Sequence, residues 1–123
     1  MSFDVVELLE SLVRCPSPSG DEQAVAALLV ARLRAAGLSP ETDGRNVWAG
    51  VGDARRGPTL LLLSHLDTVP VGDGWTRPPL DALREGDRIY GRGSNDAKGC
   101  VAAMAAALVR LAASGTRARV VLA

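Results

Sequence analysis

Three side chains of types that bind divalent metal ions lie in two short polar segments of the sequence. His65 and Asp67 follow the apolar run 60–63, and Asp96 precedes the long apolar segment 97–113. Side chains two residues apart in an extended chain point the same way, so His65 and Asp67 should share a face where a strand ends. Imidazole and carboxylate groups are common ligands of zinc. The spacing therefore predicts a metal site that contains His65 and Asp96, with Asp67 beside it.

Each of these residues also has a simpler structural interpretation. Asp96 could cap the following helix, because a carboxylate accepts hydrogen bonds from the free N–H groups of a first turn. His65 could be a solvated residue at a strand end. The segment Gly91–Gly93 could instead bind phosphate, but Gly-x-Gly alone is weak evidence and the usual downstream pattern is absent. A phosphate-binding domain should be stabilised by nucleotide and unaffected by zinc, so these two ligands would distinguish it from a metal site.

Two helices are expected in the first part of the chain. Apolar residues recur with helical spacing in 3–14 and again in 25–33. Ser19 and Glu22 have the three-residue separation of a capping box at the start of the second helix, and Gly37 is a natural stop. Because a capping box explains these polar residues, the sequence gives them no catalytic role.

The remaining elements predict an α/β fold with a layered mixed β-sheet and flanking helices. Strands are expected at four places: 46–51, 59–64, 88–90 and from residue 120 onward. The polar segment 52–57 predicts a hairpin between the first two strands, and the unbroken apolar sequence of 59–64 is typical of a strand covered on both faces. Segment 97–113 is apolar nearly all round, which is typical of a buried helix. The last strand would need further chain to complete it.

Composition limits the class of partner. Lys and Arg together number 14, as do Asp and Glu, and this zero net charge argues against nucleic acid or an anionic membrane as a partner. The beginning of the sequence lacks a signal-peptide pattern, and the chain has no uncharged apolar run of about 18 residues, so a soluble, cytoplasmic protein is expected. Cys15 and Cys100 form no metal-binding pair and are expected to be small buried residues.

Together the motifs resemble the co-catalytic zinc aminoacylase and carboxypeptidase family, which includes acetylornithine deacetylase, succinyl-diaminopimelate desuccinylase and related dipeptidases. The residues that carry the resemblance occur in the same order as in that family: Pro16–Glu22, Ser64–Pro70, Trp75, Pro78–Pro79 and Gly86–Gly99. Because these segments are spread over most of the chain, the resemblance implies a zinc-exopeptidase-like catalytic domain.

By position, the resemblance makes His65 a ligand of one zinc ion and Asp96 the carboxylate that bridges two. Asp67 would be the catalytic aspartate that orients His65. A cis peptide bond would precede Ala97, where the family usually has methionine. The implied reaction is hydrolysis of the amide bond of an N-acyl amino acid or a dipeptide in amino-acid metabolism, with two Zn²⁺ ions, or Co²⁺ in their place.

The resemblance also implies that part of the site lies outside this sequence. The family's general base is the first of two adjacent glutamates after the strand near Val120, and this sequence has no Glu after Glu85 and no second His. Residues 1–123 are therefore expected to be the N-terminal part of an incomplete catalytic domain, without the lid or dimerisation domain. A homodimer is implied for the longer protein. The chain alone is expected to be inactive, and a truncated, non-catalytic binding or assembly module is the alternative.

Overall fold

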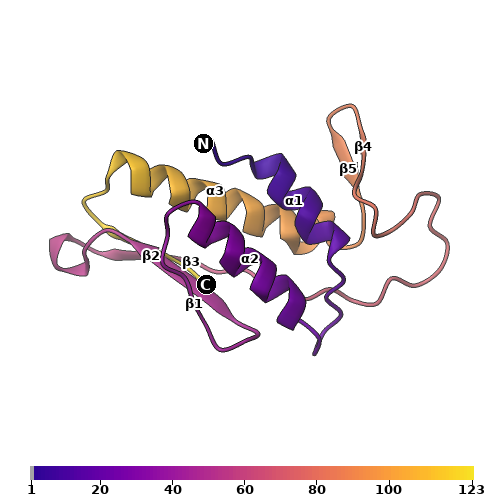
Figure 1. Cartoon of the computed structure of the whole chain (residues 1–123), viewed down its shortest axis with the longest axis horizontal. Coiled ribbons are helices and arrows are strands. Elements are labelled where there is room, and N and C mark those ends of the chain that lie inside the picture. The colour runs from indigo at the N-terminus through magenta and orange to yellow at the C-terminus, as the bar shows by residue number, and fades with distance from the viewer. Residues whose placement is uncertain (1) are drawn as a thin grey trace.

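The computed structural model describes residues 2–123, which form three helices and two small sheets (Figure 1). The elements in chain order are α1 (Val5–Arg14), α2 (Gln23–Ala35), β1 (Glu41–Thr42), β2 (Val47–Val51), β3 (Thr59–Leu62), β4 (Leu83–Glu85), β5 (Arg88–Tyr90), α3 (Gly99–Ser114) and β6 (Arg119–Leu122). Short helical turns cover Ala54–Arg56 and Ser94–Lys98. The α/β fold predicted from the sequence is confirmed.

Local chemistry accounts for the start of α1 and the end of α2. The carboxylate of Asp4 accepts hydrogen bonds from the N–H groups of Val6 and Glu7, at 2.9 and 3.1 Å, and so caps α1. Helix α2 ends before Gly37, whose φ of +88° is a left-handed conformation that glycine adopts without steric cost. The predicted helix spans and the predicted stop at Gly37 are therefore confirmed.

The larger sheet has the strand order β1-β2-β6-β3. Strand β2 runs antiparallel to β6, and β3 runs parallel to it, so the predicted mixed sheet is confirmed. The predicted hairpin between β2 and β3 is wrong, because β6 lies between them. Val120 and Leu122 of β6 are buried, at 5% and 3% exposed, and the central position gives this apolar strand a neighbour on each side.

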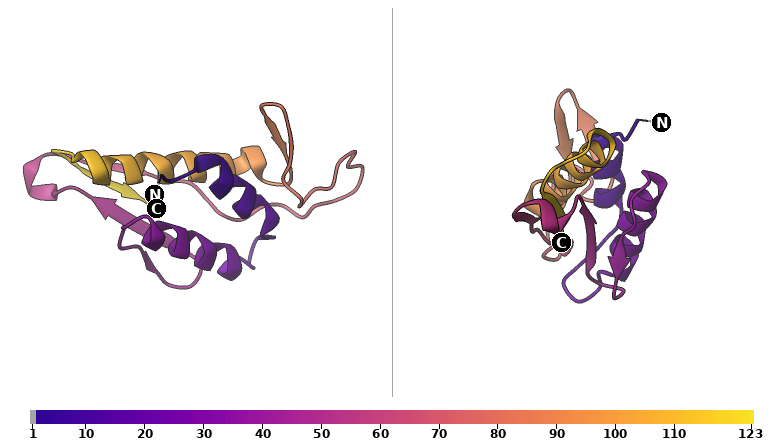
Figure 2. Two further views of the ribbon diagram at one scale, coloured as in Figure 1. Left: turned by 45° about the horizontal axis from the view of Figure 1, so that its top comes forward. Right: turned by 90° about the vertical axis from the view of Figure 1, so that its left-hand side faces the viewer.

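One hydrophobic core joins the sheet to all three helices. Helices α2 and α3 both contact β2, α3 also contacts β6, and α1 packs on α2 and α3 (Figures 1 and 2). The core residues lie on the inward faces of these elements: Leu8, Leu12, Val25, Leu29, Leu33, Val47, Ala49, Val101, Ala105, Leu108, Val120 and Leu122. This packing fixes the ends of β3 and α3, where the polar motifs lie.

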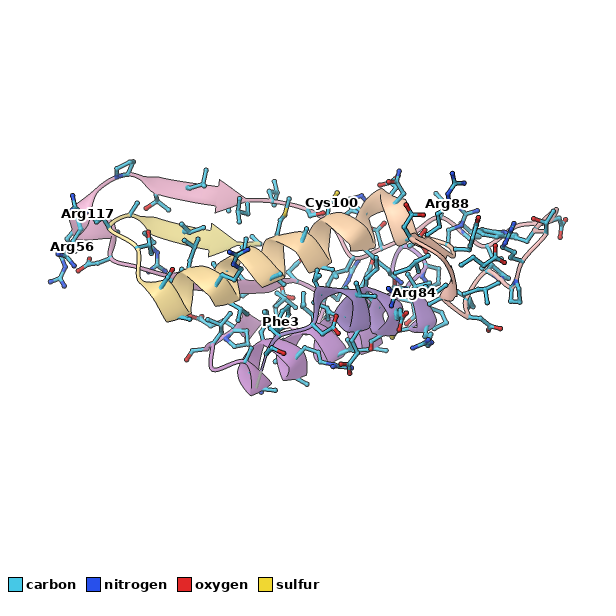
Figure 3. The ribbon with its side chains drawn as sticks, turned by 90° about the horizontal axis from the view of Figure 1, so that it is seen from above. Phe3, Arg56, Arg84, Arg88, Cys100 and Arg117 are labelled. Carbon is cyan, nitrogen blue, oxygen red and sulfur yellow. The ribbon has the colours of Figure 1, made fainter. Side chains whose placement is uncertain are left out.

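Strand β3 is more exposed than its sequence predicts. It lies beside β6 at the outer edge of the sheet (Figure 3), and Leu60, Leu61 and Leu63 are 57%, 55% and 67% exposed. The prediction of a strand covered on both faces is therefore wrong for residues 2–123. An unbroken apolar sequence shows a tendency to be buried, but it does not show that a neighbouring element is present.

Helix α3 is likewise buried along only one face. Val101 and Ala105 face the core, while Ala103, Ala107 and Cys100 are exposed, and Figure 3 shows Cys100 on the open side of the helix. The predictions of a helix buried all round and of a buried Cys100 are wrong for the described residues. Segment Ser94–Ser114 is long and apolar enough to cross a membrane by length and composition alone. Here its apolar face packs against α1, β2 and β6.

Candidate metal centre

The predicted site residues meet beyond the carboxyl end of β3. The Ala123 N–H donates to the Leu62 carbonyl at 2.9 Å and the Ser64 N–H donates to the Ala123 carbonyl at 3.0 Å, so β3 and β6 stay together up to His65. Asp96 lies in the turn that precedes α3. The carboxyl end of a parallel strand and the amino end of the helix that follows it lie at the same edge of a sheet, which is where α/β proteins build sites.

The two ring nitrogens of His65 face different partners. Nε2 is 3.0 Å from Oδ1 of Asp96. Nδ1 is 3.0 Å from the backbone carbonyl oxygen of Asp67 and 3.3 Å from Oδ1 of the same residue. The carbonyl and the carboxylates all accept, so a protonated ring donates from both nitrogens. In the neutral ring only one nitrogen keeps a proton; Nδ1 faces two acceptor atoms and Nε2 faces one, which favours the proton on Nδ1 and a lone pair on Nε2. The structure thus brings all three predicted residues together, and the roles assigned to them stay predictions.

Asp96 does not cap helix α3. Its backbone is not helical (φ −121°, ψ 93°), and the residue at the helix start is Lys98. The peptide bond between Asp96 and Ala97 is cis, as the resemblance implies. The Asp96 carboxylate is 86% exposed and its closest partner is the His65 ring. The capping interpretation is therefore wrong, and the carboxylate remains available to a ligand.

The donor atoms fit a zinc ion as one part of its ligand shell. Two atoms bound to the same tetrahedral zinc, with bonds of about 2.0–2.1 Å, lie roughly 3.3 Å apart. The 3.0 Å between His65 Nε2 and Asp96 Oδ1 is close to this separation. Within residues 2–123 no three His, Cys, Asp or Glu side chains are grouped to hold a metal ion. Asp67 adds no third donor because it lies at Nδ1, on the other edge of the ring.

Hydrogen bonds set the charge state of the site. The pKa of His65 is raised, chiefly because its Nδ1–H donates to the Asp67 carbonyl and further because Asp96 is close; partial burial opposes both effects. The pKa of Asp67 is lowered, chiefly because its carboxylate accepts a hydrogen bond from Ser19. Without a metal, His65 therefore holds a proton more readily than a free histidine, between two carboxylates.

Ser19 contacts the site, although its sequence pattern predicts a helix cap. Helix α2 begins at Gln23 after Glu22 and has no side-chain cap, so the predicted capping box is wrong. The Ser19 hydroxyl donates instead to Oδ2 of Asp67 at 2.5 Å. Glu22 accepts from the Gly20 N–H at 2.7 Å and from Nε of Arg45 at 2.9 Å. The local sequence carries no signal for the contact between Ser19 and Asp67, because it joins residues 48 positions apart.

Lys98 attaches the Asp96 turn to the end of α1. Its side chain is 1% exposed, and its ammonium group donates to the carbonyls of Leu12 at 2.8 Å and Cys15 at 2.9 Å. Burial lowers the pKa of this lysine. The last carbonyls of a helix lack partners within the helix. The Leu12 carbonyl also accepts from the Cys15 N–H at 3.2 Å, whereas Lys98 is the donor to the Cys15 carbonyl.

Arg92, the charged residue of the alternative phosphate motif, has a structural partner. Its guanidinium donates to the Val71 carbonyl at 3.0 Å and lies over the Trp75 ring, 5.1 Å from the centroid. The flanking glycines permit close packing, because a Cβ at Gly93 would lie 2.6 Å from Cγ2 of Thr68. These contacts favour a structural role for the segment.

Two surface cavities meet at His65. One, of about 250 Å³, is lined by residues that include Ser19, His65, Asp67 and Asp96. The other, of about 310 Å³, is lined by His65 and Asp67 and by apolar side chains that include Trp48. The candidate metal-binding atoms therefore open into space that a small molecule can enter.

Comparisons with known proteins identify the family. The sequence model of Peptidase family M20/M25/M40 matches residues 61–123, which include His65, Asp67 and Asp96. The M20 family metallo-carboxypeptidase from Sulfolobus solfataricus is 28% identical with a TM-score of 0.83, and the match covers 97% of this chain and 30% of that one.

Two further solved structures share the fold at lower identity. Human carnosine dipeptidase 1 is 22% identical with a TM-score of 0.78, and the match covers 96% of this chain and 30% of that one. A dinuclear metal binding peptidase of the M20 family from Bacillus subtilis is 14% identical with a TM-score of 0.70, with coverages of 96% and 33%. The chain thus spans about a third of the length of these structures. By the family match, the chain belongs to the peptidase family M20/M25/M40.

Proposed function

We propose that this chain forms the metal-binding part of a hydrolase that cleaves the amide bond of small peptides or N-acyl amino acids. The observation that carries the proposal is the 3.0 Å approach of His65 Nε2 to Asp96 Oδ1, with Nδ1 of the ring held by Asp67. An imidazole nitrogen and a carboxylate oxygen directed at one point are a zinc-type donor pair. Membership of a peptidase family supports a hydrolytic reaction.

Two metal ions are proposed for the complete site, with zinc as the metal. His65 would bind one ion, and Asp96 would bridge both, since its 86% exposed carboxylate has a second oxygen free. The dinuclear relative from Bacillus subtilis supports this number. When bound, such ions would lower the pKa of a water molecule toward about 7 and polarise the amide carbonyl.

The residues of this chain orient the ligands rather than move the catalytic proton. Asp67 keeps the proton on Nδ1 of His65, which leaves Nε2 for the metal. We propose that a glutamate of a longer protein, beyond residue 123, is the general base. Acetylornithine, succinyl-diaminopimelate and dipeptides are the proposed substrate types, and a homodimer is the proposed assembly of that longer protein.

Calorimetric titration with zinc tests the metal site. The chain is expected to bind zinc weakly through His65 and Asp96, because two protein ligands make an incomplete shell. The variants His65→Ala and Asp96→Asn should each weaken binding by more than about tenfold. Asp87→Asn, which removes an exposed carboxylate from the β4–β5 turn, is the matched control and should bind as the wild type does. Unchanged binding in both site variants would refute the metal site.

A hydrolysis assay tests the division of the site between this chain and the longer protein. Residues 1–123 with saturating zinc should not hydrolyse N-acyl amino acids or dipeptides above the rate without protein, because a general base is needed to take the proton of the attacking water. Zinc-dependent turnover by these residues would show instead that the base is already among them.

A further inference from the structure

The segment Pro16–Gly20 runs beside the strand end that carries the site. The Thr68 N–H donates to the Ser17 carbonyl at 2.9 Å, and the Ser19 N–H donates to the Thr68 carbonyl at 3.1 Å. The buried hydroxyl of Ser17 adds a 2.7 Å bond to the carbonyl of Leu66. Two main-chain bonds to Thr68 and the Ser17 side-chain bond to Leu66 therefore fix the segment on both sides of Asp67, and none of the three uses the Ser19 hydroxyl.

The Ser19 hydroxyl fixes the rotation of the Asp67 carboxylate. It donates to Oδ2 at 2.5 Å, and the other oxygen, Oδ1, then faces Nδ1 of His65 at 3.3 Å. The last torsion of an aspartate side chain has broad minima, so a carboxylate without a fixed donor turns readily. Asp67 is 37% exposed, and water would compete for its oxygens if Ser19 were removed.

The orientation of Asp67 affects the nitrogen at which the metal would bind. With Oδ1 and the backbone carbonyl of Asp67 both accepting at Nδ1, the neutral ring keeps its proton there. The lone pair of Nε2, on the side of the ring that faces Asp96, is then free to bind a metal ion. The hydroxyl is thus two contacts away from the metal-binding atom, through Asp67 and then through the imidazole of His65.

We propose that Ser19 is a positioning residue of the metal site, whose hydroxyl holds the Asp67 carboxylate against Nδ1 of His65 and so keeps Nε2 as the metal-binding nitrogen. The proposal deepens the metal-binding function proposed above and rests on it for its consequence. The surrounding loop is held independently of the hydroxyl, because Glu22 binds the Gly20 N–H and the side chain of Arg45. Loss of the hydroxyl alone should therefore change the carboxylate without unfolding the segment.

The experiment uses the single histidine of this sequence. A long-range ¹H–¹⁵N spectrum of the metal-free chain, recorded above the pKa of His65, reports which ring nitrogen carries the proton, with no ambiguity of assignment. Wild type should be mainly protonated at Nδ1. In Ser19→Ala the share protonated at Nε2 should rise about threefold, a partial change because the Asp67 carbonyl still accepts. Ser19→Thr, which keeps a hydroxyl, should restore the wild-type share.

Zinc affinity measured on the same proteins supplies the second readout. Ser19→Ala should weaken zinc binding by about tenfold, the usual cost of losing a group that orients a ligand. Ser114→Ala, which removes an exposed hydroxyl at the end of α3, should change neither readout. An unchanged proton position in Ser19→Ala would overturn the proposal even if zinc binds at His65. If the wild type binds no zinc, the proposed function fails, and the proton position still decides the role of Ser19.

Discussion

At the scale of single residues, the proposed site requires that a proton and a metal ion compete for Nε2 of His65. The pKa of this histidine is raised, chiefly by the hydrogen bond from Nδ1–H to the Asp67 carbonyl. Below that pKa the ring is an imidazolium and has no lone pair for a metal; above it the ring is neutral and can bind. Zinc affinity should therefore fall as the pH is lowered through the raised pKa, by about tenfold per pH unit once the ring is protonated.

Calorimetry at several pH values between about 5 and 8 measures this competition, since histidine titrates in that range. The midpoint should lie above the pKa of a free histidine. Asp67→Asn should lower the midpoint, because it removes a negative charge beside Nδ1. A zinc affinity that is the same at both ends of the range would show that His65 is not a ligand.

Lys98 supports the site through the fold rather than through its charge. Lys98→Met keeps the length of the side chain but removes the donor to the carbonyls of Leu12 and Cys15. The Leu12 carbonyl keeps its bond from the Cys15 N–H, but the Cys15 carbonyl loses its donor. Leaving a buried polar group without a partner costs about 1–3 kcal/mol, and we expect a loss of that size in the free energy of unfolding.

Urea unfolding of the two proteins measures the difference. The matched control is Arg34→Met on the exposed side of α2, which removes a positive charge from the surface and should change the free energy of unfolding by less than about 0.5 kcal/mol. Equal stability of Lys98→Met and wild type would contradict the structural role given to this lysine.

At the scale of elements, local patterns predicted the positions of the helices and the alternating strand β2. Gly37 ends α2 as predicted. The same patterns failed where the partner is distant in sequence. Strand β6 enters between β2 and β3, and Ser19 contacts Asp67, 48 positions away. A local pattern records propensity and periodicity, whereas these arrangements depend on which distant segments meet.

The candidate site was likewise predicted only in part from the sequence. The types and spacing of His65, Asp67 and Asp96 predicted that they would meet, because strand and helix ends share an edge of an α/β sheet. The rotation of the Asp67 carboxylate and the burial of Lys98 could not be predicted, because both depend on the end of α1 and the loop after it.

Close packing between α1 and the site loop gives a prediction at this scale. A Cβ at Gly91 would lie 2.4 Å from Cγ1 of Val13, which is fully buried in α1. Gly91→Ala should therefore destabilise the fold by about 1–3 kcal/mol through overpacking. Val13→Ala removes the atom that would clash, so the double variant should lose less stability than the sum of the two single changes.

Urea unfolding of the four proteins gives this coupling, which should be about 0.5–3 kcal/mol in the favourable direction. Val25→Ala combined with Gly91→Ala is the comparison cycle. Val25 is equally buried, but it lies in α2 rather than against the glycine, and its effect should simply add. Additive costs for Val13 and Gly91 would show that the two do not pack together.

At the scale of the whole molecule, the helices cover one face of the sheet and the site lies at one end of it. The β4–β5 hairpin and the loop before it extend beyond the layers at that end (Figures 1 and 2). The solved relatives are about three times longer than the matched segment. The described residues therefore supply a folded platform with one proposed ligand pair, and residues outside them are proposed to complete both the metal shell and the chemistry.

The exposed edge strand β3 gives a prediction for the molecule as a whole. Leu60 and Leu61 of β3, and Leu63 just after it, are each more than half exposed, and the strand has one free edge. Exposed apolar edge strands pair with other chains. Purified residues 1–123 should therefore associate as their concentration rises, as measured by sedimentation velocity.

Leu61→Lys places a charge on this edge and should reduce association. Ala113→Lys adds the same charge to an exposed site on α3 and should not. A wild-type chain that stays monomeric at every concentration, or an equal effect of both lysines, would contradict association through β3.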